Sequence, residues 1–90
     1  MTGIFHAVVS AAPLPGLRLL VRFSGGQEKE YSLRPLLDRF PVFQALRDVP
    51  GLFDQVRTDP GGYGISWNDD LDLSCEELWA NGHPVSPSTR

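Results

Sequence analysis

The feature of this 90-residue chain that most constrains its fold is a doubly specified helix start near its C-terminal end. Ser74 is an N-cap residue, and Glu77, three positions later, completes a Ser-x-x-Glu capping box. Leu73 and Leu78 stand at the two positions of the matching hydrophobic staple. The four residues together predict a helix over about 75–81.

So short a helix is not stable alone in water, and it therefore has to dock on another element. The side chains expected to dock are Cys75, Leu78 and Trp79. Gly82 is available to end the helix in the left-handed conformation. Ser66 and Trp67 read as the end of a strand that an acidic turn joins to the helix. The chain must therefore provide a sheet beside this helix.

The first third of the chain predicts that sheet. Residues 4–11 are apolar and rich in β-branched side chains, and a Pro-Leu-Pro-Gly turn at 13–16 ends the strand. Residues 17–23 alternate, so that one face carries Leu17, Leu19, Val21 and Phe23. Gly25-Gly26 favours a tight hairpin with positive φ at both glycines. Residues 27–31 then return as a polar strand.

The middle of the chain changes to a helical period. Apolar residues recur at i, i+3, i+4 and i+7, namely Leu33, Leu36, Leu37 and Phe40. Ser32 can cap this helix, Pro35 falls in its first turn and Pro41 ends it. Residues 42–46 predict a further helical turn.

A second hairpin is predicted where residues 55–58 and 63–67 flank an Asp-Pro-Gly-Gly loop. The glycine-rich run 61–64 invites comparison with a phosphate-binding loop. It lacks a following Lys-Ser/Thr and lies between two strands, whereas a P-loop joins a strand to a helix. We therefore expect these glycines to serve a turn that needs positive φ.

Together these elements predict an α+β fold, a small single domain with two antiparallel β-hairpins (about five strands) and two or three short helices. Ninety residues can supply one core. We expect the domain to span residues 1–82 and a flexible C-terminal tail to span 83–90. The single cysteine excludes an intramolecular disulfide and a zinc site built on several thiolates.

Charge and hydropathy argue against nucleic acids and membranes as binding partners. The net charge is -3, from 11 acidic and 8 basic residues, and the basic residues are scattered. Nucleic-acid binding draws on clustered cations that replace counterions, so no direct nucleic-acid partner is expected. No stretch approaches the roughly 18 apolar residues that span a bilayer, and the N-terminus lacks the pattern of a secretory signal. We expect a cytoplasmic protein without a membrane partner.

Three carboxylates form the densest group of possible ligands: Asp69, Asp70 and Asp72. With Ser74 they resemble the opening of an EF-hand loop, but Cys75 stands where that loop needs Gly, and Asn81 where it needs a bidentate Glu. We predict no metal site and no cofactor, with weak cation binding by these carboxylates left open. The leucines between them should point inward while the aspartates face water.

Cys75 is the one candidate nucleophile. The first helical position lowers a thiol pKa, but Glu76 and Glu77 oppose that effect. The two histidines, His6 and His83, are distant in sequence. We therefore predict a buried packing cysteine and assign no catalytic residue.

Apolar and aromatic side chains supply a candidate interface. Leu20 lies on the mixed face of its strand, and the polar arm after the glycines suggests a sheet that the short helices do not fully cover. Partly exposed tryptophans often anchor partner surfaces. The predicted interface residues are Leu20, Tyr31, Trp67 and Trp79.

The order of these motifs resembles a small bacterial family, domain of unknown function 2442. The resemblance covers about residues 4–80 and rests on Leu19-Leu20-Val21-Arg22-Phe23-Ser24-Gly25-Gly26, Leu33-Arg34-Pro35-Leu36-Leu37, Leu52-Phe53-Asp54-Gln55-Val56, Ile65-Ser66-Trp67-Asn68 and Leu71-Asp72-Leu73-Ser74. It implies an α+β domain with two hairpins and defines no catalytic motif. It also implies a small partner protein, because family members are often encoded beside another small protein in pairs that look like toxin–antitoxin modules.

We therefore predict a non-enzymatic protein-binding module that recognises a small protein, or a second copy of itself, through a sheet face or edge. The resemblance makes it the antitoxin-like or accessory member of a two-gene module. One alternative is a small enzyme that depends on a divalent metal or on its cysteine. A second alternative is a transcription-related regulator.

Overall fold

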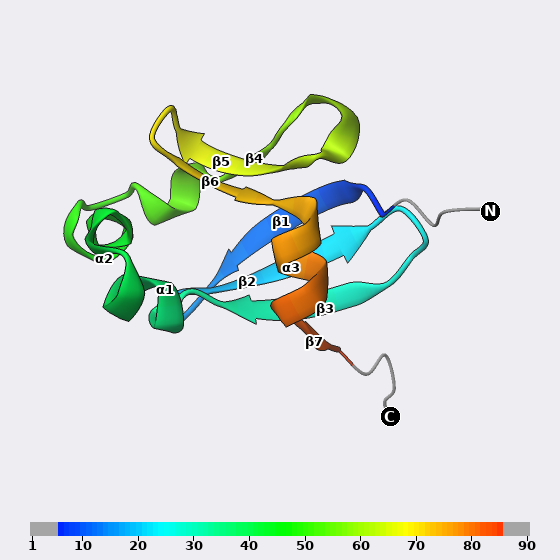
Figure 1. The fold of residues 1–90 in the computed structure, drawn as a ribbon, viewed down its shortest axis with the longest axis horizontal. Helices are drawn as coiled ribbons and strands as arrows, with labels where there is room; N and C mark the ends of the chain where they lie inside the picture. The colour runs from blue at the N-terminus through cyan, green and yellow to red at the C-terminus, as the bar shows by residue number, and fades with distance from the viewer. Residues whose placement is uncertain (1–5, 86–90) are drawn as a thin grey trace.

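The computed structural model describes residues 6–85, in which two antiparallel sheets lie on either side of one core (Figure 1). The first sheet has the order β1-β2-β3-β7, with strands Val8–Leu14, Arg18–Phe23, Glu28–Ser32 and His83–Pro84. The second has the order β4-β5-β6, with strands Arg57–Thr58, Gly64–Asn68 and Leu71–Ser74. The α+β prediction is confirmed, with seven strands in the described residues where about five were expected.

Three α-helices complete the fold: α1 Arg34–Arg39, α2 Ala45–Asp48 and α3 Cys75–Asn81. Short 3-10 helices occur at Pro41–Gln44, Phe53–Gln55 and Pro60–Gly62. In Figure 1, α1 and α2 lie at one end of the sheets, and α3 crosses in front of them. None of the described helices has the length and apolar character needed to cross a membrane.

Strand β2 shows the predicted alternation. Leu19, Val21 and Phe23 are at most 1% exposed and point into the core. Arg18, Leu20 and Arg22 face the other way. Leu17 does not extend this inward series, because it lies in the preceding turn with a φ of 58°.

Both connections in the first sheet differ from the prediction. β1 continues to Leu14, so Pro13 lies within it, which an edge strand tolerates because no neighbour needs its N–H. Of the strand predicted over 4–11, the first two residues lie outside the described part. In the β2–β3 hairpin only Gly26 has positive φ, and its N–H donates to the Phe23 carbonyl at 2.9 Å. The loop is one residue longer than the predicted tight turn.

The helical segments follow their local signals. The N-cap of α1 is Leu33, which makes no side-chain cap bond, so the predicted cap Ser32 lies one residue too early. The Ser32 hydroxyl still accepts the Arg34 N–H at 3.3 Å, and Pro35 lies in the first turn as predicted. Phe40 is extended, as the residue before Pro41 should be, and this ends the helix. The turn predicted over 42–46 forms as a 3-10 helix followed by α2.

The second hairpin also forms, since β4 and β5 pair antiparallel through Arg57–Ser66 and Thr58–Ile65. Its loop has positive φ at Gly61 and Gly62, as predicted. The sequence prediction missed β6, which pairs with β5. Its four residues read as part of a turn because so short a segment carries little periodicity.

The core lies between the sheets and beneath α3. Its largest fully buried side chains are Trp67, Phe23, Leu19, Leu33, Ile65, Leu71, Leu78 and Val21. Both sheets and all three α-helices contribute side chains to it. Burying each large side chain stabilises the fold by about 1.5–3 kcal/mol, which holds these elements as one unit. Leu78 of α3 is 0% exposed, which confirms that the closing helix docks on the sheets.

The end of α3 corrects two expectations. Gly82 is extended (φ -73°, ψ 156°) instead of left-handed, because the chain runs straight on into β7. A side chain at Gly82 would meet the Leu78 carbonyl at 2.6 Å and Lys29 at 3.0 Å, so close approach explains this glycine. His83 and Pro84 pair with β3, two residues beyond the expected domain end. The rest of the tail predicted over 83–90, from residue 86 onward, lies outside the described residues.

Candidate functional site

The capping signal that dominates the sequence serves two purposes in the structure. The Ser74 hydroxyl accepts the Glu77 N–H at 3.0 Å, as predicted. The Glu77 carboxylate instead accepts hydrogen bonds from the Tyr31 hydroxyl at 2.7 Å and from the Asn81 amide at 2.9 Å. One half of the capping box therefore starts α3, and the other half ties α3 to β3.

Tyr31 is a structural tie with little exposed surface. It is only 3% exposed. Burial, and then the hydrogen bond and negative charge of Glu77, raise the pKa of Tyr31 well above its ordinary value. The hydroxyl therefore remains protonated and continues to donate to Glu77. Tyr31 lines a hollow beside Leu36 and Arg39 but exposes too little surface to be an anchor of the predicted interface.

Trp67 is also removed from that interface. Its side chain is 2% exposed, and its indole N–H donates to the Phe53 carbonyl at 3.1 Å. Its ring stacks on Phe53 with centroids 6.4 Å apart. Strand alternation could have revealed this, because Trp67 lies two residues after the buried Ile65 and so shares its inward face of β5.

Trp79 is partly buried, and its ring is contacted by its own chain. His6 stacks on it with centroids 3.5 Å apart, and Phe23 meets it edge-on at 4.9 Å. The Lys29 ammonium lies 4.0 Å from the ring centroid and donates to the Trp79 carbonyl at 2.5 Å. The ring thus joins α3 to β3 and to the segment before β1.

Cys75 is buried as predicted, at 5% exposure. Its thiol donates to the His6 carbonyl at 2.6 Å. Burial, with a smaller contribution from Glu76, raises the pKa of this thiol. A protonated, hydrogen-bonded thiol is a poor nucleophile, so the local environment favours packing over reactivity.

The aspartates do not converge. Asn68 accepts the N–H groups of Asp70 at 2.9 Å and Leu71 at 3.0 Å, which closes the β5–β6 turn. Asp70 and Asp72 are exposed, while Leu71 and Leu73 are buried, as expected. Within residues 6–85, no group of three or more His, Cys, Asp and Glu side chains is placed to hold a metal ion.

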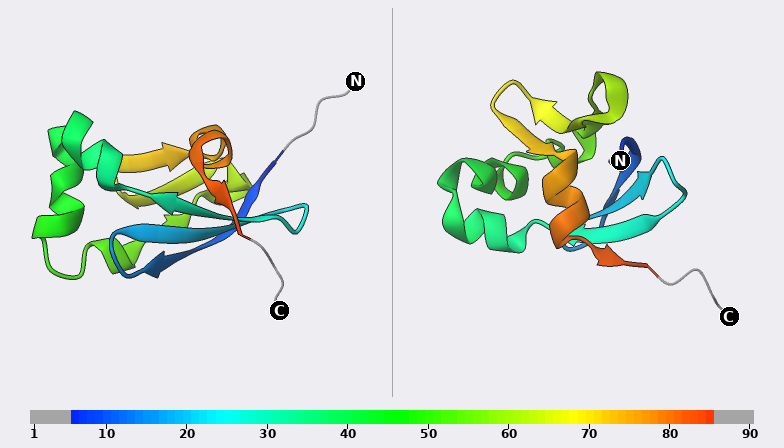
Figure 2. Two further views of the ribbon diagram at one scale, coloured as in Figure 1. Left: turned by 90° about the horizontal axis from the view of Figure 1, so that it is seen from below. Right: turned by 45° about the vertical axis from the view of Figure 1, so that its right-hand side comes forward.

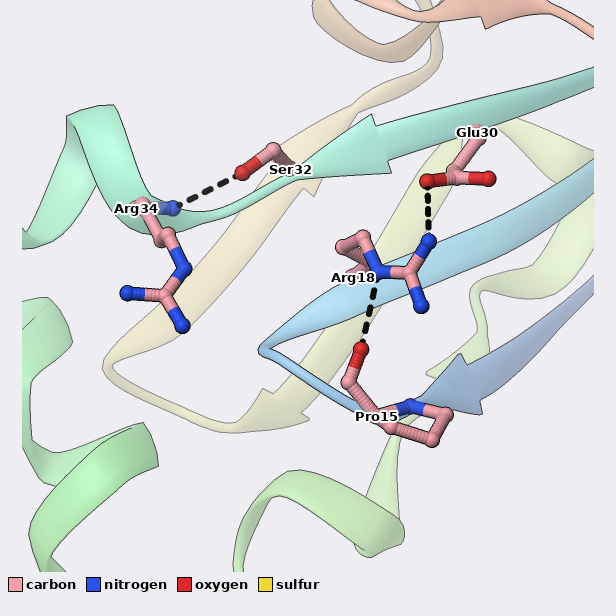
Figure 3. Close-up of polar contacts among 5 residues, drawn as sticks. All are labelled: Pro15, Arg18, Glu30, Ser32 and Arg34. Atoms are coloured by element: carbon pink, nitrogen blue, oxygen red, sulfur yellow. Dashed lines mark hydrogen bonds and ion pairs between the residues drawn. The ribbon is translucent and has the colours of Figure 1, made fainter.

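Leu20, the fourth predicted interface residue, lies on the outer face of the first sheet. Two cross-strand ion pairs flank it, Arg18–Glu30 at 2.6 Å and Arg22–Glu28 at 2.9 Å. Figure 3 shows Arg18 also donating to the Pro15 carbonyl at 2.8 Å, with Arg34 nearby at the start of α1. The charged groups on either side of Leu20 are thus satisfied by one another.

A groove that sequence reasoning missed is lined by residues of α1, β6 and α3. Figure 2 shows the ribbons of these three elements from two further directions. The groove consists of a hollow of about 400 Å³ and an adjoining hollow of about 330 Å³, which share four lining residues. The shared residues are Leu36, Arg39, Glu77 and Asn81. Phe40, Phe43 and the β6 residues Asp72 to Ser74 line the larger hollow. We call this the α1–α3 groove.

Phe40 corrects a sequence assignment. Its helical spacing placed it in the core, but it is 46% exposed because α1 ends at Arg39 and Phe40 is extended. The Pro41 signal, which predicts an extended preceding residue, could have revealed this. The Arg39 guanidinium lies 5.5 Å from the Phe40 ring centroid. Arg39 forms no ion pair with the residues that the structure describes.

Residues 8–84 match the family described as "Protein of unknown function (DUF2442)". The chain belongs to this family. The resemblance drawn from the order of the motifs is thereby confirmed, over nearly the same part of the chain. The search of curated proteins and the search of solved structures each found no match to this DUF2442 domain.

Proposed function

We propose that this DUF2442 domain is a non-enzymatic module that binds a small protein through the α1–α3 groove. The observation that carries the proposal is Phe40, a large aromatic side chain 46% exposed at the lip of a hollow. Exposed aromatic residues beside concave apolar surface are typical binding hot spots. Leu36 and Phe43 form the apolar wall next to it.

The adjacent Arg39 adds a polar contact for a partner. Its guanidinium has no carboxylate partner among the described residues, and the Phe40 ring lies beside it. Arginine and aromatic residues are the types most enriched at the centres of protein interfaces. This pair gives the groove the composition of an interface.

The test is a matched pair of substitutions. Phe40→Asp should lower partner capture at least about tenfold, since a hot-spot residue contributes 2 kcal/mol or more. Val49→Asp is the control, because Val49 is 48% exposed but does not line the groove. Capture from native lysate is followed by titration of the purified partner. Equal capture by both variants would count against the groove, and a strict monomer that captures nothing would count against the function.

The finer proposal, drawn from the family resemblance, is an antitoxin-like or accessory role beside a small protein encoded by a neighbouring gene. Co-expression of the two proteins should yield a complex that Phe40→Asp disrupts. If the neighbour slows growth, co-expression of the unsubstituted domain should restore it. A neighbouring protein that neither copurifies nor changes growth would remove this role.

The non-enzymatic part of the proposal is supported by the hydrogen bonds that the potentially catalytic side chains make within the domain. The Cys75 thiol bonds to His6, and the Glu77 carboxylate bonds to Tyr31 and Asn81. We expect Mg²⁺ and Ca²⁺ to leave the melting temperature unchanged, and a thiol reagent to modify Cys75 only as the protein unfolds. Modification at the rate of free cysteine would instead favour the enzyme alternative.

We also propose that the domain works in the cytoplasm and does not bind nucleic acid directly. The net charge of -3 supports the second point, because it supplies no excess cation. Cell fractionation tests the location. Titration with duplex DNA at low and high salt tests the binding, and salt-dependent affinity would favour the regulator alternative.

A further inference from the structure

We infer that the α1–α3 groove receives an extended segment of the partner, which pairs with the free edge of β6 as a fourth strand of the second sheet and carries alternating apolar and basic residues. The inference rests on the proposed function and specifies the partner chemistry. Its structural basis is the backbone of β6, the apolar wall of the groove and the acidity of the surrounding chain.

The hydrogen-bonding pattern of β6 leaves its outer edge open. β6 is the last strand in the order β4-β5-β6. The Cys75 N–H donates to the Tyr63 carbonyl at 2.7 Å, and Leu73 pairs with Ile65 two residues earlier in the same register. Because hydrogen-bonded positions alternate along an antiparallel pair, the N–H and C=O of Asp72 and the N–H of Ser74 point away from β5.

These outward groups have no partner among residues 6–85, although the groove gives access to them. No described backbone or side-chain group bonds to the Asp72 or Ser74 N–H. Both residues line the larger hollow of the groove. Unpaired edge groups are a template for an added strand, the recognition mode in which main-chain bonds supply affinity.

The other strand edges are less suited to this role. β1, the long edge of the first sheet, contains Pro13 and contacts β4. β4 and β7 have two residues each, and β7 includes Pro84. Proline and short length are the usual means by which proteins protect sheet edges. β6 has neither a proline nor a neighbouring strand on its outer side.

Charge and apolar surface define the segment that would fit. Between residues 58 and 89 the chain has no lysine or arginine and six acidic residues: Asp59, Asp69, Asp70, Asp72, Glu76 and Glu77. The larger hollow of the groove is lined by two carboxylates, the exposed Asp72 of the edge strand and Glu77, against one cation, Arg39. Phe40 and Phe43 line the groove on the other side. A strand with alternate side chains on its two faces would therefore direct apolar residues toward the phenylalanines and basic residues toward the carboxylates.

The first test uses a defined probe, a blocked ten-residue peptide that alternates lysine and valine, titrated into the full chain by amide NMR. We expect the Asp72 and Ser74 amides to shift and to become protected from hydrogen exchange, with little change at Leu73, which is already paired. A glutamate–valine peptide should bind at least about tenfold more weakly at low salt, since like charges repel at an interface. Equal binding of the two peptides would overturn the basic chemistry.

The second test separates backbone pairing from charge. Asp72→Pro removes the outward N–H, which an edge position tolerates, while Asp72→Ala keeps the N–H and removes the carboxylate. We expect Asp72→Pro to weaken binding of the lysine–valine peptide about tenfold, because it removes an edge hydrogen bond and blocks the edge sterically, and Asp72→Ala to weaken it about threefold. A folded Asp72→Pro variant that binds as tightly as Asp72→Ala would overturn strand pairing.

A third test does not depend on whether the Asp72→Pro variant folds. The same peptide, N-methylated at alternate backbone nitrogens, should lose binding to the unsubstituted protein. If the methylated peptide binds as well as its parent, strand pairing is overturned. That result would leave the proposed function intact. Whether the groove is an interface is tested independently, by titrating the purified protein partner into the Phe40→Asp variant.

Discussion

The outer face of the first sheet and the α1–α3 groove are both accessible, but they differ in what they leave unsatisfied. On the outer face, Arg18 and Arg22 each meet a glutamate on the next strand. In the groove, the outward Asp72 N–H has no hydrogen-bond partner among the described residues, and Phe40 is exposed. Exposure alone does not mark a binding surface. Groups that lack an internal partner have more to gain from an external one.

A leucine-to-alanine substitution should show the largest difference in stability between the two regions. Leu78→Ala, under the wall of the groove, should lower the free energy of unfolding by about 2–5 kcal/mol, because it leaves a cavity at a fully buried site. Leu20→Ala, on the partly buried outer face, should lower it by less than about 1 kcal/mol. Urea denaturation of both variants measures the difference. Similar losses would contradict the assigned burial.

Removing the tie behind the groove should have the next largest effect. Tyr31→Phe should destabilise the domain by about 1–2 kcal/mol, because it deletes a bond to a carboxylate and leaves Glu77 with one fewer donor. Unfolding free energies at pH 8 provide the measurement.

The pH dependence of that tie has a defined sign. The pKa of Tyr31 is raised in the folded protein, so its contribution is complete below about pH 10, the ordinary tyrosine value. Above that pH the unfolded chain ionises first, and stability should fall. Tyr31→Phe should remove this part of the alkaline loss. An unchanged alkaline slope in the variant would show that other groups cause it.

The helix cap at the edge of the groove should matter less. Ser74→Ala should lower stability by about 1 kcal/mol, because the Glu77 N–H loses its acceptor. Ser74→Asp should retain most of the stability, since aspartate also caps helices well. Thermal and urea unfolding would test both. If aspartate proves as damaging as alanine, the loss does not arise from capping.

The smallest effect is expected on the outer face. A double-mutant cycle on Arg22 and Glu28 should give a coupling of about 0.2–1 kcal/mol, because both side chains are solvent-accessible. High salt should reduce the coupling further. A coupling well above this range, insensitive to salt, would show that the ion pairs hold the sheet together and would weaken the contrast drawn above.

Local sequence signals were sufficient to predict those elements whose structure depends only on nearby residues. The Ser74 and Glu77 spacing located α3 at its observed bounds, and Pro35 and Pro41 located α1. Alternation placed Leu19, Val21 and Phe23 in the core. Each of these signals acts within a few residues, through a cap, a missing N–H or a strand face, and so does not depend on distant parts of the chain.

The sequence by itself thus determined the fold class, the closing helix and the family, whereas the tertiary structure alone decided where a partner could bind. Strand β6 exists because β5 lies beside it, and its open edge follows from that register. Tyr31 and Trp67 are buried by elements distant in sequence, while Phe40 is exposed where α1 ends. Burial and unpaired backbone groups are properties of packed neighbours, and neighbours brought together from distant positions leave no local pattern.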